Sequence, residues 1–209
     1  MVERNRVLAA NKHRLSLLPH NRLQIHSPHN MSRPSLVWID CEMTGLAATD
    51  KLIEIAVIIT DDDLNIIAEG PNLIISQPKE VMDKMNEWCI EHHGASGLTA
   101  AVLASDISTE KACTQVLDFI KQYIPEPQRG ILAGNSVHAD KVFLEREMRP
   151  IVDHLHYRIV DVSTVKELAR RWYPKEFQQV PQKKEAHRAL DDIKESINEL
   201  KYYRGAVFK

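Results

Sequence analysis

Cysteine is scarce in this sequence, and its spacing excludes two kinds of site. The three cysteines, Cys41, Cys89 and Cys113, are widely separated and form no Cys-x-x-Cys pair. This pattern predicts neither a disulfide framework nor a cysteine-ligated zinc site, and it fits a reducing compartment. A hydrophobic run of transmembrane length is also missing, as is the apolar stretch of a secretory signal. We therefore expect the cysteines to be thiols of a protein core.

A large excess of positive charge is also lacking, which limits the expected partners. The formal net charge is -2, from 27 basic and 29 acidic residues. Residues 1–35 hold six of the basic residues and one of the acidic ones, so by subtraction the remainder carries 21 basic and 28 acidic residues. An acidic domain is poorly suited to wrapping a long nucleic acid. Any phosphate chemistry is therefore expected to be local and assisted by metal ions.

Residues 1–34 differ in composition from the rest and are interpreted as a basic N-terminal extension. Leu15, Leu17 and Leu18 lie among its arginines, which resembles a mitochondrial presequence. The alternatives are a disordered tail, or translation that starts at Met31. The expected location is therefore the mitochondrion, the cytoplasm or both. Residues 35–209 are long and hydrophobic enough to form one globular domain.

The segment 36–46 brings two carboxylates to the end of a predicted strand. Four apolar residues precede Asp40, and Gly45 follows Glu42 closely. Because side chains alternate along a strand, Asp40 and Glu42 point to one face while Cys41 points to the other. Two such acids repel unless a cation lies between them, and oxygen ligands suit magnesium or manganese. An isolated Asp-x-Glu is more often a pair of surface acids, but the buried strand argues against that here.

The remaining chain alternates strand and helix patterns. Further strands are predicted at 52–59, 65–69 with an extension at 73–75, 131–134 and 158–162. Helices are predicted at 79–93, 108–124, a segment that includes 143–148, 163–172 with Ser163 as its cap, and 186–204. Residues 178–185 are polar and predict a mobile loop. A hairpin followed by strand–helix units predicts a mixed five-stranded α/β sheet with helices on its faces.

Two later clusters supply further candidate site residues. Asp140 follows the 131–134 strand, and functional groups gather at strand ends in open α/β sheets. The last helix begins with two adjacent acids. At about 100° per residue, Asp191 falls on the polar side, whereas Asp192 groups with small residues that permit close approach to the sheet. Asp192 is therefore the expected inward carboxylate. His187 alone would be read as a surface histidine.

Together, these residues resemble the DEDD exonuclease superfamily in its histidine branch. The four acids Asp40, Glu42, Asp140 and Asp192 occur in the order of that pattern, and His187 lies five positions before the last. The segments 38–46 (WIDCEMTGL), 161–172 (DVSTVKELARRW) and 187–196 (HRALDDIKES) are similar to the oligoribonuclease family. The resemblance covers about residues 35–209.

The resemblance implies a ribonuclease-H-like fold, a homodimer and 3′-to-5′ hydrolysis of very short RNA, dinucleotides above all, to mononucleotides. It implies two divalent ions, Mg²⁺ or Mn²⁺, held by the four acids, a number that would balance about four negative charges. His187 suits a general base, because its reference pKa is near neutrality. The implied substrate-binding residues are Leu46, Trp88, His93, Ser136, Tyr157, Arg158, Ser163 and Lys166.

The substrate-binding residues have simpler interpretations too. Trp88 fits a core aromatic and Leu46 simple packing, whereas Arg158 and Lys166 fit solvated charges. Tyr157, expected to reach the partner subunit's site, could pack within its own chain.

Three functions compete on the sequence alone. They are a short-RNA exoribonuclease, a DNA-directed exonuclease with the same metal core, and an inactive nucleic-acid-binding domain. The intact set of five catalytic positions disfavours the third, and the segment 161–172 favours the first over the second.

Overall fold

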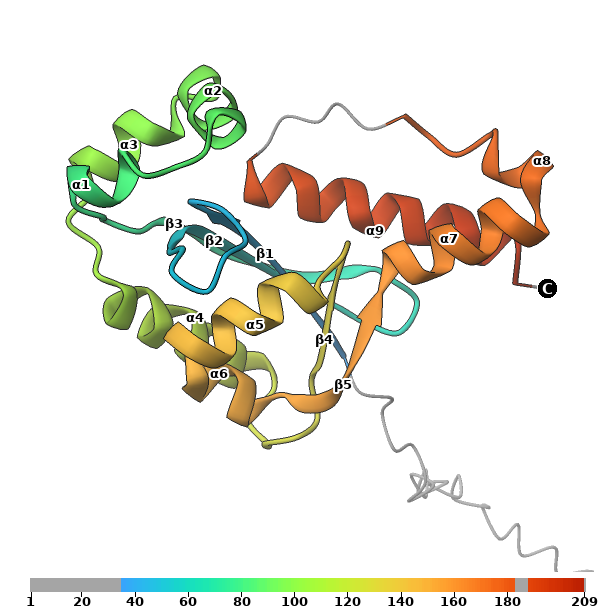
Figure 1. Ribbon diagram of the computed structural model, residues 1–209. Helices are drawn as coiled ribbons and strands as arrows, with labels where there is room; N and C mark the ends of the chain where they lie inside the picture. Colours follow the sequence, from blue (N-terminus) through green and yellow to red (C-terminus); the bar gives the residue numbers. More distant parts are fainter. Residues whose placement is uncertain (1–34, 183–187, 209) are drawn as a thin grey trace, which may run out of the picture. The chain divides into compact units, whose positions relative to one another are not determined.

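The computed structural model describes residues 35–182 and 188–208, which form a mixed sheet with helices on both faces (Figure 1). The strands are β1 (Leu36–Met43), β2 (Leu52–Thr60), β3 (Ile66–Ile74), β4 (Ile131–Gly134) and β5 (His156–Asp161). The helices are α1 (Lys79–Met82), α2 (Glu87–Ala95), α3 (Leu98–Ala104), α4 (Thr109–Tyr123), α5 (His138–Glu147), α6 (Arg149–His154), α7 (Val162–Trp172), α8 (Pro174–Phe177) and α9 (Ala189–Ala206). The predicted five-stranded sheet is confirmed.

The strands lie in the order β3-β2-β1-β4-β5, so the strand with the two acids is central. β2 pairs antiparallel with β3, which confirms the predicted hairpin, and β1 also pairs antiparallel with β2. β4 is parallel to β1, and β5 is parallel to β4. Every residue of β2 is buried, which explains why its sequence is apolar apart from Glu54 and Thr60.

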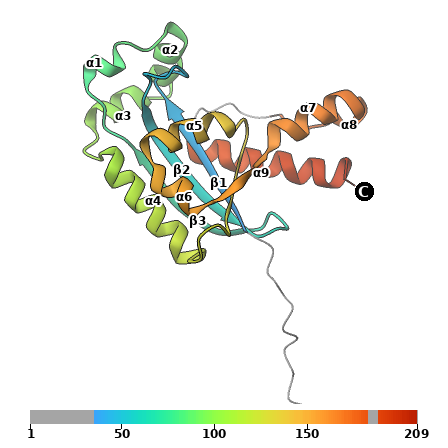
Figure 2. The same ribbon diagram turned by 60° about the horizontal axis from the view of Figure 1, so that its bottom comes forward.

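Alternation along β1 divides its side chains between two cores. Val37, Ile39 and Cys41 belong to the core that includes buried residues of α4, α5 and α6. Trp38 belongs to the second core, which includes residues of α7 and α9. Figure 2 shows α4, α5 and α6 on one side of the sheet and α9 on the other. Asp40 shares the side of Trp38, so both strand acids face α9.

The predicted helix at 79–93 is wrong as a single element, because the chain breaks between α1 and α2. The side chain of Asn86 accepts a hydrogen bond from the backbone N–H of Cys89 and caps a new helix. Helical periodicity alone could not reveal this break. Pattern reasoning also missed α3, whose Leu98 and Val102 pack with Met82 and other residues in a third small core.

Two other helix boundaries differ from the prediction. Ser163 does not cap α7: Asp161 does, by accepting a hydrogen bond from the Ser163 backbone N–H. This leaves the Ser163 hydroxyl available for contacts described below. The helix predicted to include Met148 ends at Glu147, with Met148 as its C-cap, and α6 follows with Pro150 in its first turn.

The N-terminal extension predicted at 1–34 lies outside the described residues, as does part of the predicted loop 178–185. Within the described ranges, no helix has both the length and the hydrophobicity needed to cross a membrane.

Candidate active site

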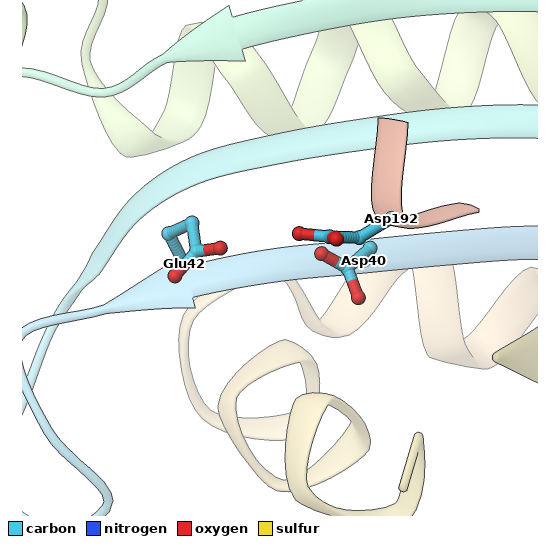
Figure 3. A group of neighbouring side chains, drawn as sticks. All are labelled: Asp40, Glu42 and Asp192. Atoms are coloured by element: carbon cyan, nitrogen blue, oxygen red, sulfur yellow. The ribbon is translucent and has the colours of Figure 1, made fainter. Parts of the chain in front are cut away.

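Three carboxylates meet between β1 and the start of α9. One oxygen from each of Asp40, Glu42 and Asp192 lies within 4.8 Å of those from the other two. Figure 3 shows Asp40 and Glu42 on the strand and Asp192 reaching toward them from the helix. Because Asp192 is distant in sequence from the two strand acids, the sheet and α9 together create the cluster. We call these three residues the acid cluster.

The packing of α9 selects Asp192 over its neighbour. Ala189, Ile193 and Ile197 are buried, and α9 packs against β1 and β2. Asp192 lies in the same first turn and faces the strand, whereas Asp191 is exposed. The small side chain of Ala189 permits this close approach. The structure therefore places the acid that helical geometry selected within the cluster.

Asp140, the fourth predicted acid, comes from α5 on the other side of β1. Only 6% of its surface is exposed, and its Oδ1 accepts a hydrogen bond of 2.9 Å from the Cys41 backbone N–H. It is not among the three residues whose oxygens share the 4.8 Å limit. Its charge still acts on the cluster, because repulsion by Asp140 is among the causes that raise the pKa of Asp40.

Burial and mutual repulsion make the acid cluster reluctant to ionise. Desolvation is the largest cause that raises the pKa of Asp40 well above its usual range. Desolvation, followed by repulsion from Asp192, raises the pKa of Glu42 to about 8. Desolvation also raises the pKa of Asp140 to about 7, although its hydrogen bond with Cys41 opposes the shift. Buried oxygen donors that repel one another fit a site for divalent cations, which would stabilise all of them as carboxylates.

An ion pair between buried Glu54 and partly exposed Arg188 lies next to the acid cluster and was not predicted. Glu54 on β2 is opposite Glu42 in the strand register and is 0% exposed. Glu54 Oε1 lies 3.3 Å from Nη2 of Arg188, the residue just before α9. Glu54 helps to raise the pKa of Glu42, and Arg188 lowers it. In the sequence, Glu54 is the one polar residue of the predicted strand 52–59. This was the only local sign that it has a special role.

The pH dependence of stability offers a test of this electrostatic description. The raised pKa of Glu42 means that the folded state holds a proton more strongly than the unfolded state, whose value is about 4.5. Stability from that proton is full below pH 4.5 and is lost as the pH rises through about 8. We expect Glu42→Gln to stabilise the metal-free protein at pH 9 by a few kcal/mol, since each pKa unit corresponds to about 1.4 kcal/mol.

Thermal unfolding of the metal-free protein at pH 5 and pH 9 provides the measurement. The exposed Glu91→Gln is the matched control and is expected to change neither value. A Glu42→Gln variant that is equally destabilised at both pH values would contradict the expected repulsion.

A pocket beside Glu42 contains three of the predicted substrate-binding residues. Leu46, Trp88 and His93 line a cavity of about 400 Å³ together with Glu42. Leu46 is 75% exposed and Trp88 is half exposed, so simple core packing does not describe either residue. His93 is buried, and its Nε2–H donates a 2.9 Å hydrogen bond to the Met43 carbonyl. The pocket thus offers apolar walls next to the acids.

The turn after β1 presents Leu46 to this pocket. Asp50 accepts hydrogen bonds from the Thr44 hydroxyl and from the Ala47 backbone N–H. A Cβ added to Gly45 would lie 2.5 Å from Asp50 Oδ2, so this turn requires glycine. These contacts hold an exposed leucine in place without burying it.

The other predicted substrate-binding residues are divided between two places. Ser136 and Ser163 share a hydrogen bond of 3.0 Å between their hydroxyls. Lys166 Nζ lies 3.8 Å from Glu199, and the Arg158 guanidinium lies over the Tyr157 ring, 5.0 Å from its centre. The structure therefore brings the two serines together, and it gives each cation another partner.

Tyr157 is 67% exposed on β5, a strand at the edge of the sheet. Its ring stacks on His156 and lies under Arg158. Tyr157 therefore contacts neighbouring residues of its own chain, while most of its side chain stays exposed. His187, the predicted general base, lies outside the described residues.

Comparisons with known proteins give matches over most of the chain. The profile of the exonuclease family RNase_T matches residues 37–200. The chain is 58% identical to the mouse protein named "Oligoribonuclease, mitochondrial", over 83% of this chain and 73% of that protein. It is 52% identical to "Probable oligoribonuclease" of Dictyostelium discoideum, over 88% of this chain and 96% of that protein.

Solved structures support the fold. An apo exonuclease I is similar to this chain with a TM-score of 0.64 at 15% identity, and an Escherichia coli exonuclease I bound to a dA16 oligonucleotide with a TM-score of 0.65 at 14% identity. The matches cover 84% and 83% of this chain but only 43% and 41% of those structures. At such low identity the similarity shows the exonuclease fold alone, which agrees with the predicted ribonuclease-H-like architecture.

Proposed function

The chain belongs to the oligoribonucleases, 3′-to-5′ exonucleases of the RNase_T family that degrade short oligoribonucleotides, and we propose that it hydrolyses dinucleotides above all, with two divalent metal ions. The observation that carries the proposal is the acid cluster, in which buried oxygens from β1 and α9 lie within 4.8 Å of one another. Such a cluster has little use in a protein that only binds nucleic acid, because it repels phosphate.

Asp40, Glu42, Asp140 and Asp192 would hold the ions, magnesium or manganese. When bound, paired divalent ions neutralise charge at the attacking and leaving oxygens of a phosphodiester. The four carboxylates carry about four negative charges, which two such ions balance.

The other residues act on the substrate and on the proton. His187 takes the proton from the attacking water, and the 3′ oxygen of the remaining chain leaves the phosphorus. Leu46 and Trp88 pack against bases, which is a sequence-tolerant contact because every base has an apolar face. His93 supports the wall of the same pocket through its hydrogen bond with Met43.

Ser136, Arg158, Ser163 and Lys166 would cap the terminal 5′ phosphate. A terminal phosphate carries more charge and more free oxygens than a phosphodiester, so these contacts favour a chain that ends there. The hydrogen-bonded pair of Ser136 and Ser163 supports this role, since hydroxyls of this kind bind phosphate oxygens.

The direct experiment uses a 5′-labelled seven-nucleotide RNA with magnesium, beside the DNA of the same sequence. We expect labelled products that shorten one nucleotide at a time, with RNA preferred over DNA. Immediate release of a labelled mononucleotide would show attack from the other end, and no cleavage of either this RNA or an RNA dinucleotide would refute the proposed nuclease role of the acid cluster.

Tyr157 leads to the proposal of a homodimer. Its exposed ring on an edge strand is available to a second subunit, where it would close the substrate site. Mixing an Asp140→Asn chain with a Tyr157→Ala chain tests this, because one site of the mixed dimer then has intact acids and a tyrosine from its partner. We expect activity well above that of either variant alone.

The control mixture pairs Asp140→Asn with the double variant Asp140→Asn/Tyr157→Ala. It contains no site with all four acids, so it is expected to show no gain. No gain from mixing Asp140→Asn with Tyr157→Ala would refute the role in trans.

A mitochondrial location is proposed from two observations. The mouse, bovine and human relatives are named mitochondrial, and residues 1–34 are basic with interspersed leucines. Import of a reporter fused to residues 1–34 tests it, and a cytoplasmic reporter would favour the alternative start at Met31.

A further inference from the structure

A chain of hydrogen bonds connects the exposed serine pair with the interior of the protein. The Ser163 hydroxyl donates to Asn135 Oδ1 at 3.0 Å. Asn135 Nδ2 donates in turn to Ser196 Oγ at 2.9 Å and to Glu199 Oε2 at 3.1 Å. Three elements that are distant in sequence are joined: the turn after β4, the first turn of α7, and α9. We call these contacts the Asn135 network.

The inner end of the Asn135 network is a buried charge. Glu199 is 2% exposed, and a buried carboxylate is costly unless it is paired and hydrogen-bonded. Lys166 lies 3.8 Å from its Oε1, and the Tyr203 hydroxyl donates to the same oxygen at 3.4 Å. Since a carboxylate only accepts hydrogen bonds, Glu199 forces the amide of Asn135 to turn its NH₂ inward and its oxygen outward.

This orientation sets the direction of every hydrogen bond toward the surface. The outward oxygen of Asn135 takes the single hydroxyl proton of Ser163. The lone pairs of Ser163 Oγ then accept from the backbone N–H of Ser136 at 2.9 Å and from the Ser136 hydroxyl at 3.0 Å. The Ser136 hydroxyl thereby uses its single proton on Ser163, and it donates to an acceptor from solvent only by rotating away from Ser163.

The backbone at Ser136 shows that this arrangement is imposed by its surroundings. Its φ of 51° lies in the left-handed region, which costs a residue with a side chain. Two acceptors hold its N–H there, Asp161 Oδ1 and Ser163 Oγ, both at 2.9 Å. The serine pair is therefore preorganised.

The same network reaches the helix that carries the acid cluster. The Ser196 hydroxyl donates to the Asp192 backbone carbonyl at 2.8 Å, so Ser196 lies one helical turn, about 6 Å, beyond that acid. The serine pair and the acid cluster are thus connected through one partly buried side chain, that of Asn135.

We propose that Asn135 and Glu199 are positioning residues that fix the serine pair and Lys166 relative to the acid cluster, and thereby set the position of the terminal 5′ phosphate of a dinucleotide. The inference rests on the proposed function, because it assigns support to residues that are proposed to bind this phosphate. Asn135 and Glu199 themselves touch neither substrate nor metal. They act by setting the position at which the terminal 5′ phosphate of the substrate is bound.

Asn135→Asp is the informative variant, because it keeps the acceptor for Ser163 and places a carboxylate against Glu199. We expect the KM for a 5′-phosphorylated dinucleotide to rise about tenfold or more, which corresponds to one lost charge-assisted contact. The KM for the same dinucleotide with a 5′-hydroxyl, the kcat and the magnesium dependence are expected to change by less than about threefold. Asn198→Asp is the matched control, since Asn198 is exposed on the same helix and its change adds the same charge.

The double variant Asn135→Asp/Glu199→Gln provides the rescue. The glutamine amide that it introduces on α9 can donate to the introduced aspartate, which restores one inner hydrogen bond and leaves the outer bonds unchanged. Part of the lost preference for the 5′ phosphate is therefore expected to return. Glu199→Gln alone provides an independent test if Asn135→Asp does not fold. It is expected to raise the KM for the 5′-phosphorylated dinucleotide, because the orientation of the Asn135 amide is no longer fixed.

The outcomes separate this inference from the proposed function. If the wild-type enzyme shows no preference for a 5′-phosphorylated dinucleotide, both are overturned. If the wild type shows the preference and Asn135→Asp and Glu199→Gln keep it, the positioning role alone is refuted. An equal rise in KM for the phosphorylated and hydroxyl substrates, with a parallel fall in melting temperature, would reduce Asn135 to a structural residue.

Discussion

Asp192→Asn is expected to lower kcat by about 10³-fold or more and to weaken magnesium binding, while the neighbouring Asp191→Asn stays within about twofold of the wild type. Asp192 belongs to the acid cluster, and Asp191 is exposed on the same helical turn. Loss of several kcal/mol of transition-state stabilisation by bound metal ions corresponds to this factor.

The two variants are matched, because they remove the same charge at adjacent positions of α9. Turnover at a range of magnesium concentrations, with the melting temperature of each metal-free protein, separates a lost ligand from a lost fold. Near-normal turnover for Asp192→Asn together with loss for Asp191→Asn would show that the assignment of the inward acid is wrong.

His187→Ala is expected to lower kcat by about 10²–10⁴-fold with little change in substrate or metal binding. The role is proposed from its place in the sequence, five residues before Asp192 of the acid cluster. A general base must lose its proton before it can act, so the wild-type rate is expected to rise with pH on the acidic limb.

The pH profile of kcat is the measurement for His187. In His187→Ala that acidic limb is expected to disappear, because the remaining rate no longer depends on this base. An unchanged rate with the same acidic limb would rule out His187 as the base.

Much of the fold could be predicted because the decisive patterns are local. The alternation of apolar and acidic residues in β1 placed Asp40 and Glu42 on one face, and the helical angle separated Asp192 from Asp191. A hairpin followed by strand–helix units predicted a mixed sheet with helices on its faces, but the strand order, with β1 at the centre, came from the structure. The two side-chain patterns depend on neighbours within a few residues, whereas the strand order depends on segments that are distant in sequence.

The features that could not be predicted depend on partners distant in sequence. Asn135 and Glu199 are 64 positions apart, and Arg188 and Glu54 are 134 positions apart. No periodicity indicates such pairs. Ser163 shows the same limit locally: its type suits a helix cap, but Asp161 takes that place and the Ser163 hydroxyl instead joins Asn135 to Ser136.

The central claim is that the acid cluster hydrolyses RNA dinucleotides in preference to longer RNA. The most direct test is the ratio of kcat/KM for 5′-phosphorylated RNAs of two and seven nucleotides, cleaved by the wild-type enzyme with magnesium. We expect the dinucleotide to be favoured by about tenfold or more, since the longer chain must give up at least one contact with the terminal phosphate. Equal kcat/KM at both lengths would contradict the claim.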